Sequence, residues 1–185
     1  MTQDEGPAPP AAPWPSRVRS ALSECIALET ETLHARDALQ ALATEEWKRH
    51  CATFISSTQP ILVGIADMLH EQGIGATVRR LVQDQPPALP RVAHLQLAIG
   101  RFATRGPSRL TLRYVEGTGN ILADLVVEPP GFYGSSVERA LTFDIDRWSG
   151  ELVGAVAIEL LGMLWGREPQ EAIPLPDAAG SPFGG

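Results

Sequence analysis

One pair of residues has the spacing of a known metal-binding motif. Glu31 and His34 form an E-x-x-H pattern within a stretch of helical periodicity. In di-iron helical bundles, such a pair directs a carboxylate and an imidazole toward one metal. That site needs a second E-x-x-H pair and two further glutamates, and the sequence has one such pair. We therefore interpret Glu31 and His34 as neighbours on a solvated helix face.

The remaining metal-ligating residue types show no ligand spacing. The histidines, at positions 34, 50, 70 and 94, are scattered, and Cys25 and Cys51 belong to no CxxC or Cys/His pattern. Both cysteines fall on one expected helix, too far apart along it to pair, so we interpret them as free thiols in a reducing compartment. The sequence predicts no metal and no cofactor.

Motifs that bind phosphate or activate a nucleophile are not recognisable. Gly73-Ile74-Gly75 follows an expected helix instead of a strand, and Gly117-Thr118-Gly119 reads as a hairpin turn. Ser135 and Ser136 are not part of a G-x-S-x-G elbow. We predict no catalytic residue and leave enzymatic activity uncertain, leaning toward none.

Arginine is concentrated in the middle of the chain. Residues 79–115 hold seven arginines and one acidic residue, Asp84, although the chain carries a net charge of −7. On one sheet face these arginines would bind an acidic protein segment or a phosphate ligand, and Arg101, Arg109 and Arg113 are the candidate contacts. The alternative is a solvated face whose arginines pair with acidic residues of this chain or a partner. Nucleic acid is disfavoured, because no aromatic residues interleave the arginines. The seven are Arg79, Arg80, Arg91, Arg101, Arg105, Arg109 and Arg113.

The segment 128–136 is a second candidate contact. It is too long for a tight hairpin and carries adjacent aromatic residues, Phe132 and Tyr133. Aromatic side chains on loops are favoured in protein contacts. The alternative is that Phe132 folds back onto the edge of the core.

Helical periodicity dominates the first third of the chain. Apolar residues recur at steps of three, four and seven from Arg17 to about Ile55, which predicts one long helix that overhangs the core or pairs with another helix. Ser56-Ser57-Thr58-Gln59-Pro60 is expected to break it, and a second helix should follow and end at Gly73. These apolar positions include Val18, Leu22, Cys25, Ile26, Leu33, Leu39, Leu42, Trp47, Cys51 and Phe54.

The centre of the chain alternates like a sheet, and its end is an apolar helix. Strands are expected near 76–82 (where a helix also fits), 95–99, 110–114, 121–127 and 141–145. Residues 147–166 should form a helix with apolar residues around most of its circumference, which needs cover from more than the sheet. The predicted fold is therefore α+β, with two layers. An antiparallel meander of four or five strands packs against a long N-terminal helix and an apolar C-terminal helix.

Composition divides the chain into a body and two ends. We expect a disordered proline-rich tail over 1–16, a single α+β domain over 17–166 and a disordered Pro/Gly-rich tail over 167–185. The N-terminus lacks a basic start followed by an apolar run, so no signal peptide is expected. The apolar run 152–165 is too short to cross a bilayer, so the expected location is the cytoplasm.

These patterns predict contact surfaces more clearly than chemistry. Small size, acidic charge, helices and a twisted antiparallel sheet resemble the type III secretion chaperones, although here two helices precede nearly all strands. We expect a non-enzymatic, adaptor- or chaperone-like interaction domain that is oligomeric and binds another protein or a second copy of itself. The alternative is a sensor or enzyme domain that binds an anionic small molecule through sheet-face arginines.

Overall fold

The computed structural model describes residues 13–83, 90–100, 104, 106–131 and 134–166. Their contacts divide the chain into two compact units, unit 1 (residues 1–45) and unit 2 (residues 46–185). The predicted tails lie outside the described residues, apart from 13–16, where the first helix already begins. Because the placement of the two units relative to each other is not determined, we treat each one separately.

Helix α1 spans Trp14–Glu71, so the expected break at Ser56–Pro60 is wrong. Pro60 lies inside the helix, where proline removes a hydrogen bond and costs about 3 kcal/mol. Packing outweighs this cost, because Phe54, Thr58 and Leu62 are all fully buried on one side of the helix, before and after the proline-containing turn.

The two ends of α1 have recognisable signals. Pro15 occupies the first turn, where a missing N–H costs little, and the backbone of Ser16 and Arg17 donates to the Pro13 carbonyl. At the other end Gly73 has φ 72°, and the bonds from Ile74 N to Leu69 O and from Gly73 N to His70 O form a Schellman motif. The expected helix end at Gly73 is confirmed.

Five strands form one antiparallel meander in the order β1-β2-β3-β4-β5, which confirms the predicted sheet. Strand β1, for which the sequence also allowed a helix, pairs along its whole length with β2. The turn between β3 and β4 contains Gly117 and Gly119, both at positive φ. The strands are β1 (Gly75–Gln83), β2 (Val92–Gly100), β3 (Ser108–Val115), β4 (Asn120–Val127) and β5 (Val137–Asp144).

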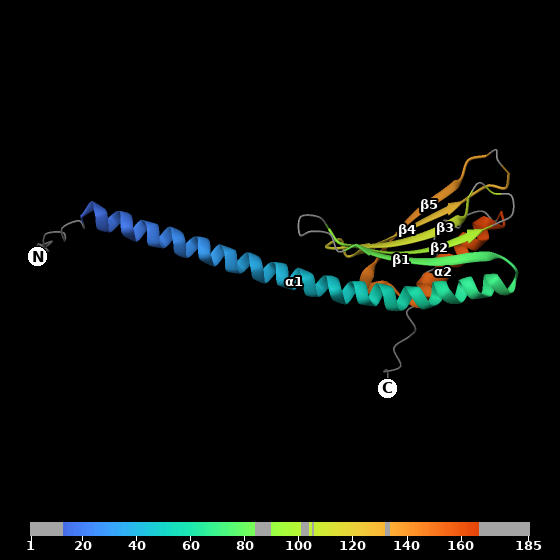
Figure 1. Ribbon diagram of the computed structural model, residues 1–185, viewed down its shortest axis with the longest axis horizontal. Coiled ribbons are helices and arrows are strands. Elements are labelled where there is room, and N and C mark those ends of the chain that lie inside the picture. The colour runs from blue at the N-terminus through green and yellow to red at the C-terminus, as the bar shows by residue number, and fades with distance from the viewer. Residues whose placement is uncertain (1–12, 84–89, 101–103, 105, 132–133, 167–185) are drawn as a thin grey trace, which may run out of the picture. The chain divides into compact units, whose positions relative to one another are not determined.

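Helices cover one face of this sheet in unit 2. A short 3₁₀ turn, η1 (Ile145–Arg147), leads from β5 into α2 (Gly150–Leu164), whose N-cap Ser149 accepts from Leu152 N. Figure 1 shows α2 and the C-terminal half of α1 on the same side of the sheet. A Cβ placed at Gly150 would lie 3.5 Å from Ile61 Cδ1, an ordinary van der Waals distance, so the start of α2 packs against α1 here. The predicted two-layer α+β fold is confirmed.

Alternation in the strands separates the core from an uncovered face. Residues of β2, β3 and β4 that point toward the helices are buried, and Phe54, Val153 and Leu160 complete the core from the helix side. Residues one position away point to what we call the outer sheet face. The buried strand residues include Ala93, Leu95, Leu97, Ile99, Leu110, Leu112, Tyr114, Ile121, Ala123 and Leu125.

Candidate functional site

Unit 1 exposes a row of apolar side chains along α1. Residues 14–43 are all exposed, and one in every three or four of them falls on a single line along the helix. Leu28, Leu39 and Leu42 are 63%, 67% and 68% exposed. Burying one such leucine is worth about 1.5–3 kcal/mol, and the described part of the chain leaves these leucines uncovered. We call this line the N-terminal stripe: Trp14, Val18, Ala21, Cys25, Leu28, Thr32, Ala35, Leu39 and Leu42.

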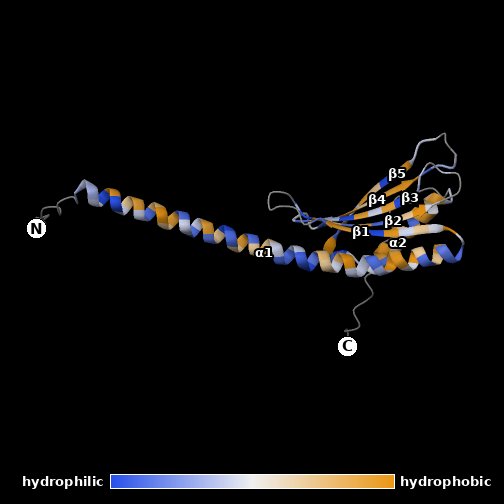
Figure 2. Cartoon of the chain, viewed as in Figure 1, coloured by the Kyte–Doolittle hydropathy of each residue, from blue (hydrophilic) through white to orange (hydrophobic). Residues whose placement is uncertain are grey.

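The N-terminal stripe follows a heptad repeat through four successive heptads. Val18, Cys25, Thr32 and Leu39 take the a positions, and Trp14, Ala21, Leu28, Ala35 and Leu42 take the d positions. Thr32 is the one polar member. Figure 2 shows apolar and hydrophilic residues interleaved along this part of α1. A heptad sustained over this length is typical of a coiled-coil strand.

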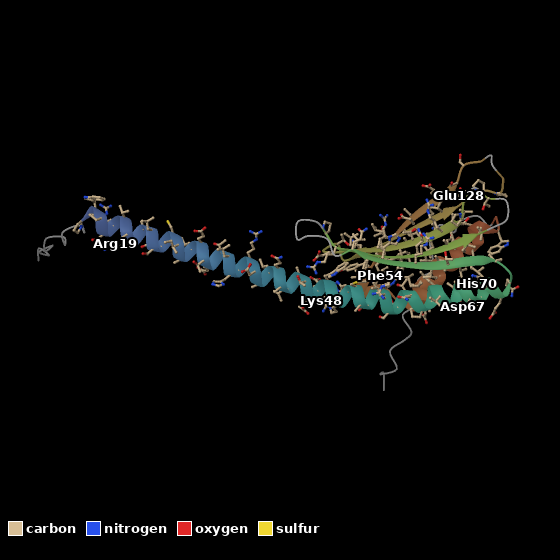
Figure 3. All side chains as sticks on the ribbon, in the orientation of Figure 1. Arg19, Lys48, Phe54, Asp67, His70 and Glu128 are labelled. Carbon is tan, nitrogen blue, oxygen red and sulfur yellow. The ribbon has the colours of Figure 1, made fainter. Side chains whose placement is uncertain are left out.

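The polar side chains of unit 1 bond within the helix itself. The hydroxyls of Thr30 and Thr32 donate to the carbonyls of Ile26 and Leu28, four residues earlier. Such back-bonding adds little to helix stability. In Figure 3, side chains such as Arg19 stand out from this part of the helix. Most helical stability in proteins comes from packing of an apolar face, and residues 14–43 have no such packing among the described residues.

Unit 2 has an apolar groove between its two helices, which we call the α1–α2 groove. It has a volume of about 420 Å³. Met68 and Ile158 are 58% and 64% exposed beside it. The C-terminal half of α1 therefore covers α2 only in part, which fits the expectation that the sheet alone cannot cover the last helix. The lining residues are Ile61, Ile65, Met68, Leu69, Gln72, Gly154, Ala157, Ile158 and Leu161.

The outer sheet face holds part of the arginine cluster. Arg109 is exposed on β3, and Arg113, four residues further along the same face, forms an ion pair with Asp124 of β4. Arg79 of β1 shares this face, since it lies opposite Gln96. Arg80 points to the other face at the sheet edge. Arginines that neighbour one another in the sequence are thus distributed over both faces.

Acidic residues share the outer sheet face, so it is not uniformly basic. Asp124 pairs with Arg113, and Glu138 of β5 lies opposite Val126 on the same side. His94 sits directly across from Arg113 in the register. Burial, and then the charge of Arg113, lower the pKa of His94, so its ring is neutral at pH 7. This composition matches the alternative of a solvated, internally paired face.

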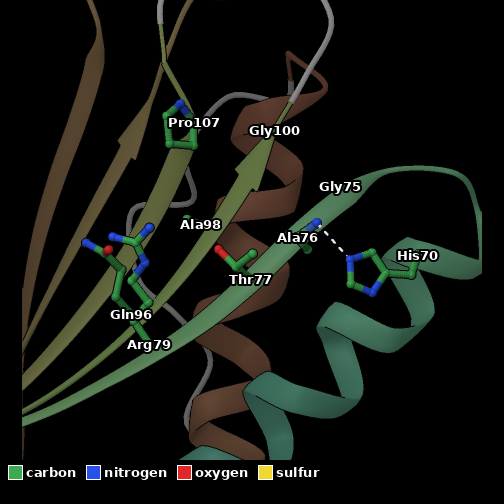
Figure 4. Close-up of a pocket in the computed structure, with 9 residues that line it drawn as sticks. All are labelled: His70, Gly75, Ala76, Thr77, Arg79, Gln96, Ala98, Gly100 and Pro107. Atoms are coloured by element: carbon green, nitrogen blue, oxygen red, sulfur yellow. Dashed lines mark hydrogen bonds between the residues drawn. The ribbon is translucent and has the colours of Figure 1, made fainter.

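A hollow of about 390 Å³ opens at one end of the outer sheet face. Figure 4 shows Arg79 beside Gln96 in its wall, with Thr77 and Pro107 nearby. His70 closes the helix side, where its Nε2 accepts a hydrogen bond from Ala76 N at 3.2 Å. One guanidinium with an amide and a hydroxyl is a weak anion site, since strong ones bring several cations or a backbone nest together.

Polar contacts inside unit 2 have a structural role. Trp148 Nε1 donates to the buried Thr58 hydroxyl at 2.8 Å, and Arg139 pairs with the buried Glu159. The Tyr114 hydroxyl bonds His50 Nδ1 at 2.9 Å. Burial, with the nearby charge of Glu46, raises the pKa of Tyr114 to about 12. Satisfied buried groups of this kind fix one arrangement of the core.

The part of the chain that the structure describes contains no group of three or more His, Cys, Asp or Glu residues placed to hold a metal ion. By length and composition, α1 is the one described helix able to cross a membrane. Of its most apolar window, 33% is buried inside the fold, and core helices pass the same criterion, so this is weak evidence for a membrane segment.

Three predicted contact residues, Arg101, Phe132 and Tyr133, lie outside the described residues. Near them, Thr104 forms isolated bridges with Pro130 and Gly131. Sequence reasoning did not find the α1–α2 groove, because it placed a break at Pro60. The heptad of the N-terminal stripe was a signal available in the sequence.

Comparison of the chain with protein-family models, curated proteins and solved structures gives no match.

Proposed function

We propose that the chain is a non-enzymatic, adaptor- or chaperone-like interaction protein of the cytoplasm that binds a helical partner through the N-terminal stripe. The observation that carries the proposal is a heptad of apolar side chains, exposed over residues 14–42. An exposed apolar row of this length is a recognition surface for another amphipathic helix. The exposed free thiol of Cys25 is compatible with a reducing compartment.

The stripe is favoured over the other surfaces as the main contact. The outer sheet face carries charges of both signs, and an exposed ion pair contributes at most about 1 kcal/mol. The α1–α2 groove involves fewer exposed apolar side chains than unit 1. An adaptor needs two contact regions, and unit 2 would supply the second through the groove or the sheet.

Site-specific photo-crosslinking in cells tests this proposal. A photoreactive residue at Leu28 or Leu39 should yield a specific protein adduct, identified by mass spectrometry. The same residue at Ser23 or Thr30, on the opposite side of the helix, should yield little. Adducts that do not depend on the side of the helix, or none from any position, would contradict the proposal.

The hollow beside Arg79 supports a second candidate, binding of an anionic small molecule. Inorganic phosphate, citrate and nucleotides would be tested by thermal shift. Stabilisation by several degrees that disappears in Arg79→Gln, but persists in Arg80→Gln on the other sheet face, would favour this function.

A further inference from the structure

We infer that the partner of the N-terminal stripe is a second copy of this chain, and that the two stripes pair as a parallel, in-register, two-stranded coiled coil. This inference rests on the proposed function, because it names the partner of the same surface. Its evidence is the residue types at the a and d positions and the charges beside them.

The a and d residues favour two parallel strands. Val18 is β-branched at an a position, and Leu28 and Leu42 occupy d positions, the combination that favours parallel dimers. Four heptads meet the length that stable pairing requires. Thr32, a polar a residue, would face its own counterpart in register and favours this alignment in the way that buried polar residues do in coiled coils.

The flanking charges distinguish parallel from antiparallel pairing. In a parallel pair, a g residue meets the e residue of the next heptad on the other strand. Glu31 at g would therefore meet Arg36 at e, twice per dimer, while Glu24 would meet Glu29 and repel it. In an antiparallel pair, g faces g and e faces e, so Glu31 and Arg36 would not meet.

The two cysteines supply an internal probe of register. Cys25 is exposed at an a position and would face its own copy across the axis, whereas Cys51 is buried in unit 2. An antiparallel pair that sets Val18 opposite Leu42 would place Cys25 near Ala35 instead. A ready disulfide between the two Cys25 residues is therefore expected for the parallel, in-register arrangement.

Sedimentation equilibrium of the purified full chain is the primary test. The chain mass is 19.9 kDa, and we expect twice this mass at micromolar concentration. Leu28→Glu combined with Leu39→Glu should raise the dimer Kd at least about a hundredfold, because four carboxylates would enter the seam. The matched control, Ser23→Glu with Thr30→Glu on the far side of the helix, should change Kd less than about threefold. Near-UV circular dichroism of Trp47 and Trp148 verifies that unit 2 stays folded.

Charge exchange and oxidation test the alignment. Arg36→Glu and Glu31→Arg should each weaken the dimer by about five- to thirtyfold, and their combination should restore it. Glu29→Arg should tighten the dimer several-fold by removing the repulsion with Glu24. Diamide should convert wild type and Cys51→Ser to covalent dimers, but not Cys25→Ser.

Three results would overturn the inference. These are a wild-type monomer at 50 μM, an oligomer other than a dimer, or a dimer unaffected by the Leu28 and Leu39 substitutions. A stripe-dependent dimer with neither charge rescue nor a Cys25 disulfide would overturn the parallel register. If the chain is a monomer and its Leu28 photo-adduct in cells contains a different protein, the inference is contradicted but the proposed function is supported. If no adduct forms, both are contradicted.

Discussion

Between Trp47 and Leu69, α1 buries a side chain in every turn, whereas between Trp14 and Leu42 its apolar side chains are exposed. Both halves have helical periodicity, so local sequence does not distinguish them. The difference lies in the partner: residues 47–69 pack on the core of unit 2, and residues 14–42 have an equivalent surface that no described residue covers. One helix therefore contains a half whose partner is intramolecular and a half for which we propose an intermolecular one.

The largest contrast should come from truncating one apolar side chain in each half. Phe54→Ala removes a fully buried ring and should cost about 3–5 kcal/mol of unfolding free energy. Leu39→Ala, at concentrations low enough to keep the chain monomeric, should cost less than about 0.5 kcal/mol. Urea unfolding followed by tryptophan fluorescence measures both. Equal losses of unfolding free energy would mean that Phe54 and Leu39 lie in equivalent environments.

A smaller effect should come from the proline that the buried half tolerates. Pro60 is exposed and sits inside the helix, so Pro60→Ala should restore a helical hydrogen bond without removing a packing contact. We expect a gain of about 1–2 kcal/mol, the helix-interior penalty of proline less its entropic benefit in the unfolded chain. Pro15→Ala, in the first turn of the same helix, is the control and should change stability by less than about 0.5 kcal/mol. A loss of stability in Pro60→Ala would refute this account of the continuous helix.

The pKa of Tyr114 is a probe of the packing between the buried half of α1 (residues 47–69) and the sheet. It stacks on Trp47 at a centroid distance of 5.3 Å and bonds His50. Because burial raises its pKa to about 12, the folded state binds its proton more tightly than the unfolded state does. The contribution of the Tyr114 phenol to the free energy of unfolding should be complete below pH 10 and be lost as pH rises from 10 to 12. Ultraviolet titration should show a phenol with a pKa near 12 that is missing in Tyr114→Phe; a pKa near 10 would show that the contact is open.

His94, on the outer sheet face, should give the smallest effect. Burial and Arg113 lower its pKa, so the folded state binds this proton less tightly than the unfolded state. The contribution of the neutral His94 ring to the free energy of unfolding is present above pH 6.5, the ordinary pKa of histidine. It is lost as the pH falls below that value. His94→Gln should therefore lose less stability than wild type between pH 7.5 and 5, with a difference in Tm of no more than about 3 °C. Identical acid sensitivity would contradict the half-buried placement of the ring beside Arg113.

The fold was largely predictable because the hydrophobic periodicity of the sequence identifies most of its helices and strands. Alternation in 95–99, 110–114 and 141–145 predicted three of the five strands, and the turn at Gly117 and Gly119 predicted the hairpin that adds 121–127. The continuity of α1 was not predictable from local propensity. Pro60 predicts a break, and only the tertiary burial of Phe54, Thr58 and Leu62 on both sides of it reverses that expectation.

The candidate site was less predictable, because it depends on which residues share a face. Arg79 and Arg80 are adjacent in sequence but point to opposite faces of β1, and Asp124 reaches Arg113 from a neighbouring strand. A count of arginines along the chain therefore overstated the charge of the outer sheet face. The N-terminal stripe became meaningful only once residues 14–43 were known to be exposed.

Amide hydrogen exchange, measured at 50 μM and after dilution, shows whether residues 14–45 need a partner to be a stable helix. Protection in residues 14–45 should be high at 50 μM and should fall both on dilution and in the variant carrying Leu28→Glu and Leu39→Glu. Protection in residues 47–69 should stay the same in both proteins. Equal protection of the two halves in the variant, independent of concentration, would show that residues 14–45 are a stable helix by themselves. That result would contradict the account, because it would leave the N-terminal stripe without need of a partner.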